Sequence, residues 1–190
     1  PGDRRRSVRG RFARWGGYVN AALMTLDDDS AQTLGLPFDS TDLPIRGATD
    51  LKGWEIDWRA PLFLRGLSAV GSFTNWPSGS VAVYLPNQTW RAALEYHALP
   101  LKSGNLELLG RLEMRRRGQV IAMQRDTAAK WVEEVLPSYD QIDGYFQIRI
   151  IDVRLFIRAE NMRNQPIPEL PGRTITSPRF MYGVKWQFWN

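Results

Sequence analysis

The sequence offers few side chains of the types that carry out catalysis. Cysteine is absent and His97 is the only histidine, so we expect neither a Cys/His metal cluster nor a catalytic site built on several histidines. Ser68, Ser72 and Thr74 have no base near them in the sequence pattern. A lone histidine is more typical of a residue that forms hydrogen bonds than of a ligand. We therefore predict a protein that is not an enzyme and uses no cofactor.

Two groups of charged residues could bind ions or anionic groups. Arg115–Arg117 could contact anionic lipopolysaccharide or an acidic ligand, and a solvated strand end is the simpler alternative. An acidic segment could hold Ca²⁺, because hard cations prefer several carboxylates, although its spacing matches no EF-hand and a solvated loop is the simpler interpretation. The residues of this segment are Asp27, Asp28, Asp29, Asp39 and Asp42.

The net charge of +5 is concentrated at the start of the chain. Residues 1–14 contain six arginines and one aspartate, and the remaining sequence is balanced. A local arginine cluster is more typical of a solvated segment than of a nucleic-acid site, so no nucleic-acid partner is expected. The chain has no run of eighteen apolar residues, which excludes a transmembrane helix.

The elements that position these residues are β-strands, because apolar residues recur at every second position. Residues 180–188 show the strictest alternation, with Phe180, Tyr182, Val184, Trp186 and Phe188 on one face. Seven further strands are predicted at about 8–26, 46–60, 66–76, 88–98, 104–116, 144–151 and 153–163. Gly16 and Gly17 fall inside the first of these, where glycine marks a bend or bulge. Residues 124–136 come closest to a helical period and are predicted to form a short helix in a loop.

The predicted connections alternate in length. Those at 61–65, 99–103 and 151–152 are short, and those at about 27–45, 77–87, 117–143 and 164–178 are long. In an up-and-down antiparallel sheet, alternate connections lie at opposite ends, so all short turns fall at one end. Transmembrane barrels show this asymmetry, with short periplasmic turns and longer extracellular loops.

Charged residues share the face opposite to the apolar one. The clearest example is the segment in which Trp54, Ile56 and Trp58 alternate with Glu55 and Asp57. The alternation alone fits a lipid-exposed barrel or a soluble sheet with its apolar side inward. The connection lengths favour the membrane barrel. Tryptophans and tyrosines near strand ends also favour it, because these side chains suit a membrane interface. The total volume of the aromatic side chains favours it as well, because the interior of a small soluble barrel would not hold them. The residues near strand ends are Trp76, Trp90, Tyr96, Tyr145, Trp186 and Trp189.

Several short motifs occur in a characteristic order along the chain. A paired hairpin comes first, a strand with a following asparagine motif comes later, and a closing loop then precedes the last strand. The motifs are Gly53–Ile56 with Gly66–Ser68 and Gly71–Thr74, then Asp152–Asn164, then Pro171–Arg173 and Tyr182–Phe188. In this order they resemble TonB-dependent outer-membrane receptors. The sequence departs from that pattern at its end, where Trp189 and Asn190 follow Phe188, because those barrels usually end on an aromatic residue.

The resemblance implies an all-β, antiparallel, up-and-down transmembrane β-barrel of about 22 strands, plugged by a separate domain. Residues 1–190 would form a single barrel domain or barrel fragment of about eight strands, the C-terminal part, with no plug domain. The implied function is uptake of a siderophore, another metal chelate or a different scarce nutrient. The implied partners are outer-membrane lipid, lipopolysaccharide, the small ligand and an inner-membrane energy-coupling protein that a missing N-terminal region would contact. The implied location is the bacterial outer membrane, and the ligand-contacting residues cannot be named.

Other classes remain open from the sequence. One is a free-standing eight-stranded outer-membrane barrel, since small barrels of that size exist. Another is an outer-membrane enzyme, for which no catalytic constellation is visible. The last is a soluble β-barrel or sandwich that binds a ligand or carbohydrate.

Overall fold

The computed structural model of the chain describes residues 4–27, 51–76, 85–128 and 130–186. All regular elements in these ranges are β-strands, and no helix there is long and apolar enough to cross a bilayer. The strands of the main sheet are β1 (Arg4–Arg14), β2 (Gly17–Asp27), β3 (Leu51–Pro61), β4 (Leu67–Asn75), β5 (Gln88–Ala98), β6 (Leu106–Arg117), β9 (Tyr139–Ile150), β10 (Val153–Glu160) and β13 (Arg179–Trp186).

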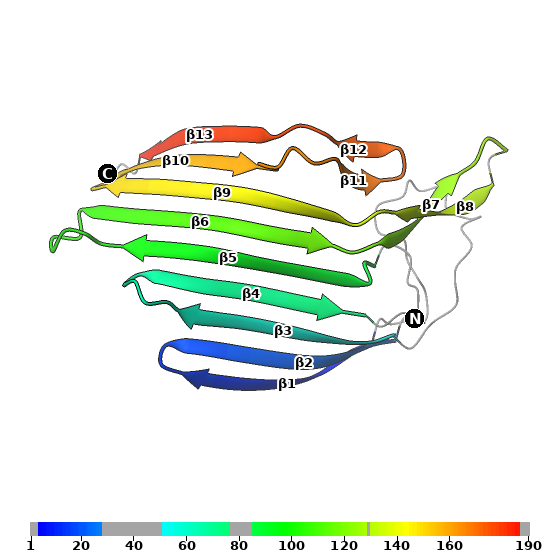
Figure 1. The fold of residues 1–190 in the computed structure, drawn as a ribbon, viewed down its shortest axis with the longest axis horizontal. Coiled ribbons are helices and arrows are strands. Elements are labelled where there is room, and N and C mark those ends of the chain that lie inside the picture. Colours follow the sequence, from blue (N-terminus) through cyan, green and yellow to red (C-terminus); the bar gives the residue numbers. More distant parts are fainter. Residues whose placement is uncertain (1–3, 28–50, 77–84, 129, 187–190) are drawn as a thin grey trace.

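The main sheet is an antiparallel meander of nine strands. Its order is β1-β2-β3-β4-β5-β6-β9-β10-β13, so every strand pairs with its predecessor in the sheet. The sheet is open, with β1 and β13 at opposite edges (Figure 1). The predicted all-β antiparallel meander is therefore confirmed, with one more strand in the sheet than the sequence pattern suggests.

The alternation of connection lengths is confirmed. The turns β1–β2, β3–β4, β5–β6 and β9–β10 all lie at the left end of the sheet in Figure 1, which we call the turn end. The opposite end, the loop end, carries two small hairpins outside the main sheet. They are β7 (Val120–Arg125) with β8 (Trp131–Leu136), and β11 (Ile167–Leu170) with β12 (Arg173–Ile175).

The single strand predicted over 8–26 is in fact two strands. Arg14 pairs with Gly17, and the two residues between them form the turn, with φ of 51° at Trp15 and 75° at Gly16. Two successive positive φ values are typical of the tight turns that connect hairpins. The sequence does not signal this turn because tryptophan rarely adopts a positive φ and because the apolar alternation continues through it. The predicted bend at Gly16 and Gly17 is thus a complete reversal.

The short helix predicted over 124–136 is also wrong. This segment contains the end of β7, the turn and all of β8, and Gln124 pairs with Val132 in the hairpin. Asp126 stabilises the turn, since its Oδ1 accepts hydrogen bonds from the backbone N–H groups of Ala128 and Lys130, each 2.8 Å long. Val132 and Val135 favour strands because β-branched side chains fit a pleated surface. Pairing with β7 therefore outweighs the weak helical period.

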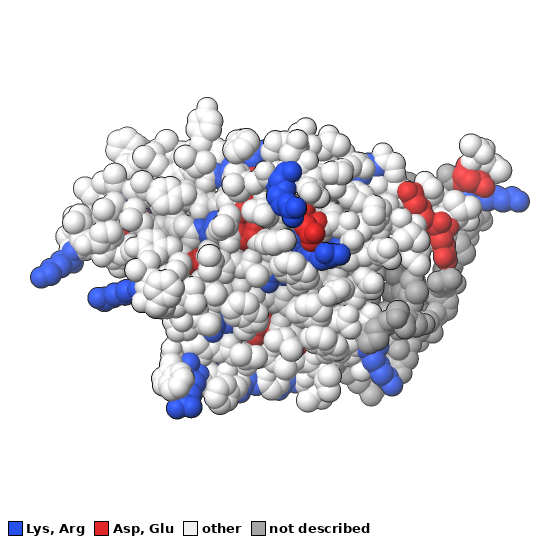
Figure 2. Space-filling view, viewed as in Figure 1, with Lys and Arg blue, Asp and Glu red and all other residues white. Residues whose placement is uncertain are grey.

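The register places most of the large apolar residues of the nine strands on one face of the main sheet, which we call the apolar face. One row of cross-strand partners runs Tyr182, Ile157, Phe146 and Gly110 across β13, β10, β9 and β6. The opposite face, the polar face, carries Glu95, Arg111 and Tyr145 in the same way. In Figure 2, most of the visible surface over the strands belongs to uncharged residues.

Burial is inverted relative to a water-soluble sheet. On the apolar face Leu94 is 46% exposed and Ile157 is 58% exposed, whereas on the polar face Gln141 is 5% exposed and Gln147 and Glu160 are 9% exposed. Soluble proteins bury large apolar side chains and expose charged ones. Among the described residues, no second layer covers the apolar face.

The buried apolar residues of the described chain are few. Val120, Ala122 and Leu136 form one cluster between β7 and β8 at the loop end. The stability of the main sheet therefore depends on its hydrogen-bonded ladder, on cross-strand pairs and on whatever covers the apolar face.

Candidate functional site

The polar face is the part of the described structure where groups capable of polar recognition converge. It brings together side chains from strands that are far apart in the sequence, because residues two apart on each strand point to the same side. Opposite charges face each other at several positions, as Glu95 faces Arg111 and Glu107 faces Arg149, which favours cross-strand ion pairs. The charged residues that form these pairs are Arg59, Glu95, His97, Glu107, Arg111, Glu113, Arg115, Asp143, Arg149, Arg158, Glu160 and Arg179.

Glu95 links the two halves of this face. Its Oε2 accepts a hydrogen bond of 2.9 Å from Arg59 Nη1, and its Oε1 accepts one from Arg111 Nη1. Arg111 also donates to Glu113. Arg59 reaches Ser68 Oγ at 3.3 Å. One carboxylate thus holds guanidinium groups from β3 and β6 on either side of β5, in the charge-assisted form that gives the stronger hydrogen bonds.

Asp143 organises the region nearer the loop end. Its Oδ2 accepts from Arg115 Nη2 at 2.7 Å, and its Oδ1 accepts from Gln141 Nε2 at 2.8 Å and from the backbone N–H of Asn161 at 2.9 Å. Asn161 is 2% exposed and has φ of 53°, a conformation that asparagine tolerates better than most residues. Its side chain donates to Gln165 O and accepts from Gln165 N–H, which closes the turn after β10.

Glu107 anchors the polar face at the turn end. Its Oε2 accepts a 2.6 Å hydrogen bond from Arg149 Nε, and its Oε1 lies 2.8 Å from His97 Nε2. Arg149 also donates to the backbone carbonyls of Gly104 and Ile151, each at 3.1 Å. These contacts tie the β5–β6 turn to the β9–β10 turn.

A hollow of about 290 Å³ opens on the polar face between β6, β9 and β10. Three guanidinium groups and two carboxylates border it together with one phenol. The lining side chains include Arg111, Glu113, Arg115, Asp143, Tyr145 and Arg158. Such a hollow can hydrogen-bond a polar partner of mixed charge.

The three consecutive arginines at 115–117 do not lie on the same face of the sheet. Arg115 and Arg117 lie on the polar face, where Arg117 Nη2 donates to Pro168 O. Arg116 lies on the apolar face at the loop end, opposite Trp90, with its Nη1 3.6 Å from Asp140 Oδ2. Of these three arginines, only Arg116 is therefore on the apolar face.

The other residues singled out in the sequence fall in two groups. His97 is on the polar face, hydrogen-bonded to Glu107, and Ser68, Ser72 and Thr74 line the same face of β4. Asp27 is the last residue of β2, and Asp28, Asp29, Asp39 and Asp42 lie outside the described residues. Within the described ranges, no group of three or more His, Cys, Asp or Glu side chains is arranged to hold a metal ion.

Sequence reasoning missed the roles of Asp143 and Asn161 as linked hydrogen-bonding centres. The alternation does place Asp143 in phase with Tyr145 and Gln147, and that signal extends the strand predicted at 144–151 back to Tyr139. It also places Tyr145 on the polar face, where its hydroxyl donates to Gln147 Oε1 at 2.8 Å. Tyr145 is thus not among the aromatic residues of the apolar face, whereas Trp90, Tyr96 and Trp186 are.

The comparisons with known proteins agree on the fold. The structure is similar to the FrpB iron transporter from Neisseria meningitidis, with a TM-score of 0.60 and 16% identity over 98% of this chain and 31% of that one. It is similar to the pyoverdine outer-membrane receptor FpvA of Pseudomonas aeruginosa PAO1, with a TM-score of 0.56 and 11% identity over 97% of this chain and 29% of that one. FpvA in complex with pyocin S2 matches at a TM-score of 0.55 and 12% identity, over 98% of this chain and 26% of that one.

The fold is that of part of an outer-membrane receptor barrel. The resemblance to TonB-dependent receptors that the sequence indicates is thus confirmed at the level of the fold. The chain spans less than a third of the length of each of these structures. No family model matches the sequence, and no curated protein matches it.

Proposed function

We propose that the chain is part of the barrel of a TonB-dependent outer-membrane receptor that takes up a siderophore, another metal chelate or a different scarce nutrient. The observation that carries this proposal is the inverted burial of a sheet with the receptor-barrel fold. Apolar side chains are exposed on one face and charged side chains are packed together on the other. In a bilayer the apolar face meets hydrocarbon and the polar face lines the interior. FrpB is named as an iron transporter and FpvA as a pyoverdine receptor, which supports this ligand class.

The strand count supports a piece of a larger barrel over a free-standing small one. β1 and β13 both run from the loop end to the turn end, because nine strands of a meander leave the first and last parallel (Figure 1). Closing the sheet on itself would require a parallel pair, whereas bacterial single-chain barrels have an even number of antiparallel strands. We propose that the two edges pair with other strands of the same receptor, as its C-terminal part, and that its plug and energy-coupling contact belong to residues outside this chain.

The polar face would then point to the barrel interior and contribute ligand contacts together with the long loops. The hollow at Arg158 and Tyr145 offers donors for a chelate that carries carboxylate or hydroxamate oxygens. The exposed guanidinium of Arg116 would contact lipopolysaccharide from the lipid side, beside Trp90 at the loop end.

The experiment that tests the proposed function uses the full-length protein in a bacterial host. Cells that express it should take up radioactive iron supplied with a panel of ferric hydroxamate, catecholate and mixed chelates. Uptake should stop when the proton-motive force is dissipated, because transport depends on the inner-membrane energy source. The receptor should fractionate with the outer membrane and migrate differently on gels before and after heating.

Two results would contradict this function. A full-length protein that is monodisperse without detergent would exclude a membrane barrel. An outer-membrane barrel that admits solutes equally well without the proton-motive force would be a passive pore instead.

A further inference from the structure

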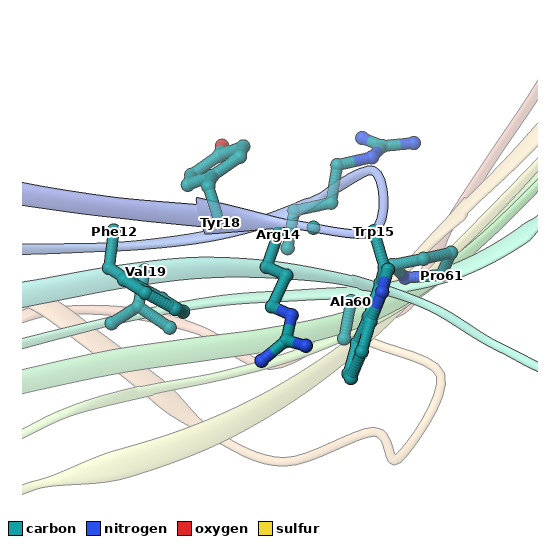
Figure 3. Close-up of a pocket in the computed structure, with 9 residues that line it drawn as sticks. Phe12, Arg14, Trp15, Tyr18, Val19, Ala60 and Pro61 are labelled. Atoms are coloured by element: carbon teal, nitrogen blue, oxygen red, sulfur yellow. The ribbon is translucent and has the colours of Figure 1, made fainter.

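A hollow of about 440 Å³ opens beside the β1–β2 hairpin, at the turn end of the sheet. Its walls are mainly apolar, and they come from three strands and one turn. Figure 3 shows that Arg14, Phe12, Val19, Trp15 and Ala60 lie on one side of this hairpin and that Tyr18 points to the other. The guanidinium of Arg14 therefore shares the apolar face with most of the lining, whereas Tyr18 and Arg59 border the hollow from the polar face.

Arg14 is out of place on that face. Its partner across the hairpin is Gly17, and its guanidinium stacks 3.9 Å from the centre of the Trp15 ring. Among the described residues it has no carboxylate partner. The other strands of the main sheet carry an uncharged residue at this end of the apolar face. These residues are Gly17, Ala60, Leu67, Ala98, Leu106, Ile150, Val153 and Trp186.

Arg14 is exposed in the described structure, and a bilayer over the apolar face would desolvate its guanidinium unless an anion paired with it. The planar fork of arginine matches the geometry of a phosphate, and a tryptophan stacked on it holds that fork in place. Phe12 and Val19, which are 67% and 46% exposed, continue the same face away from the turn. The site therefore combines a phosphate-binding group at the turn end of the sheet with an apolar surface that continues toward the middle of the strands.

We propose that this hollow binds one anionic phospholipid, with its phosphate on Arg14 and an acyl chain against Phe12 and Val19. The inference rests on the proposed function, because it requires the apolar face to meet a bilayer. It goes beyond that function by assigning a specific lipid site to the leaflet at the turn end. In the proposed barrel the short turns are periplasmic, so the leaflet at the turn end is the inner leaflet of the outer membrane.

Pairing of β1 with a further strand of the receptor would place the new backbone beside β1 and not over the hollow. A new strand adds to the free edge through backbone hydrogen bonds in the plane of the sheet, whereas side chains stand roughly perpendicular to that plane. The hollow lies over the face between β1, β2 and β3, away from the free edge.

Arg11 provides a matched control on the same strand. It also lies over an aromatic ring, 5.1 Å from the centre of Tyr18, and it is on the opposite face because it is three residues from Arg14. Neutralising either arginine changes the net charge equally, but only one change alters the proposed lipid site.

The test uses the full receptor in nanodiscs of phosphatidylcholine with increasing fractions of phosphatidylglycerol, and native mass spectrometry to count the lipids that stay bound. R14Q should weaken phosphatidylglycerol binding about tenfold, as expected for loss of a charge-assisted pair. R11Q should bind like the wild type. R14K should be intermediate, because lysine keeps the charge and loses the planar fork.

The possible failures are distinguishable. Equal phosphatidylglycerol binding by the wild type and R14Q, in receptors that insert and take up iron, would overturn the lipid site alone. Equal retention of phosphatidylcholine and phosphatidylglycerol by the wild type would overturn its selectivity for an anionic lipid. A protein that does not insert into the bilayer would overturn both the lipid site and the proposed function.

Discussion

At the scale of single residues, the polar face depends on a few carboxylates that each hold more than one partner. Glu95 forms an ion pair with Arg59 of β3 on one side of β5 and with Arg111 of β6 on the other. Both arginines are more than a third exposed, so solvent screens much of the attraction. The carboxylate itself is 24% exposed, and its loss leaves Arg59 without a carboxylate partner and Arg111 with Glu113 alone.

E95Q should therefore lower the free energy of unfolding by about 1 kcal/mol, the range of partly exposed ion pairs in a network. The measurement is the urea midpoint of the refolded receptor in detergent. E169Q is the matched control, because Glu169 is 41% exposed and lies 3.5 Å from the 70% exposed Arg173. If both variants shift the midpoint equally, Glu95 does not link the network.

Ile151 is a second residue whose local geometry has a measurable cost. It occupies the β9–β10 turn with φ of 54°, which is strongly disfavoured for a β-branched side chain. Its side chain is 57% exposed, so little packing would be lost on replacement.

I151N should raise the free energy of unfolding by about 1 kcal/mol, because asparagine adopts positive φ with less strain. The thermal midpoint of the heat-dependent gel shift would report the gain. D152N, at the adjacent turn residue, provides a comparison that leaves the strained position unchanged. A lower midpoint for I151N would mean that the isoleucine side chain makes contacts that outweigh its strain.

At the scale of elements, the strands are fitted together by aromatic rings that lie over glycines on neighbouring strands. Gly71 of β4 is directly opposite Trp58 of β3, and a Cβ placed on this glycine would lie 2.5 Å from the indole ring. Gly110 of β6 is a useful contrast, because a Cβ there would lie 3.8 Å from Tyr96 and 3.9 Å from Phe146, which is ordinary contact.

G71A should lower the free energy of unfolding by about 1–3 kcal/mol, because the indole must leave its position over β4. G110A should have little effect. Urea unfolding followed by tryptophan fluorescence would measure both, and the fluorescence of folded G71A should also change as Trp58 moves. Equal stability of the two variants would show that the indole moves aside without cost.

At the scale of the whole molecule, the two faces of the sheet have opposite tolerance for charge. The apolar face has no second protein layer over it within the described ranges, so its 46% exposed Leu94 would contact lipid in the proposed barrel. Thr74 lies on the polar face, opposite Glu55.

L94R should destabilise the barrel in lipid vesicles. The free energy of unfolding should fall by about 2–4 kcal/mol, the range measured for arginine facing the bilayer midplane. T74R should be tolerated, since the new guanidinium can pair with Glu55 inside the barrel. The fraction of heat-modifiable, inserted receptor measures the outcome. A larger loss for T74R than for L94R would reverse the assignment of the two faces.

The sequence by itself determined the strand periodicity, the two-sided character of the sheet and the separation of short turns from long loops. These are local properties, because side chains alternate along each strand whatever its neighbours are. The same reasoning failed where pairing with a distant segment decides the conformation. The Trp15–Gly16 reversal interrupts no apolar pattern, and the segment around Trp131 becomes a strand only because β7 lies beside it.

Only the tertiary structure decided which polar residues meet. Arg59 and Arg111 meet at Glu95 because of the strand register, which the sequence pattern does not determine. The hydrogen bonds to Asp143 depend on the register in the same way. The structure also decided that Arg116 and Arg14 lie on the apolar face. Because the sheet has nine strands rather than eight, its two edge strands, β1 and β13, run in the same direction. The ninth strand results from the two-residue turn at Trp15 and Gly16.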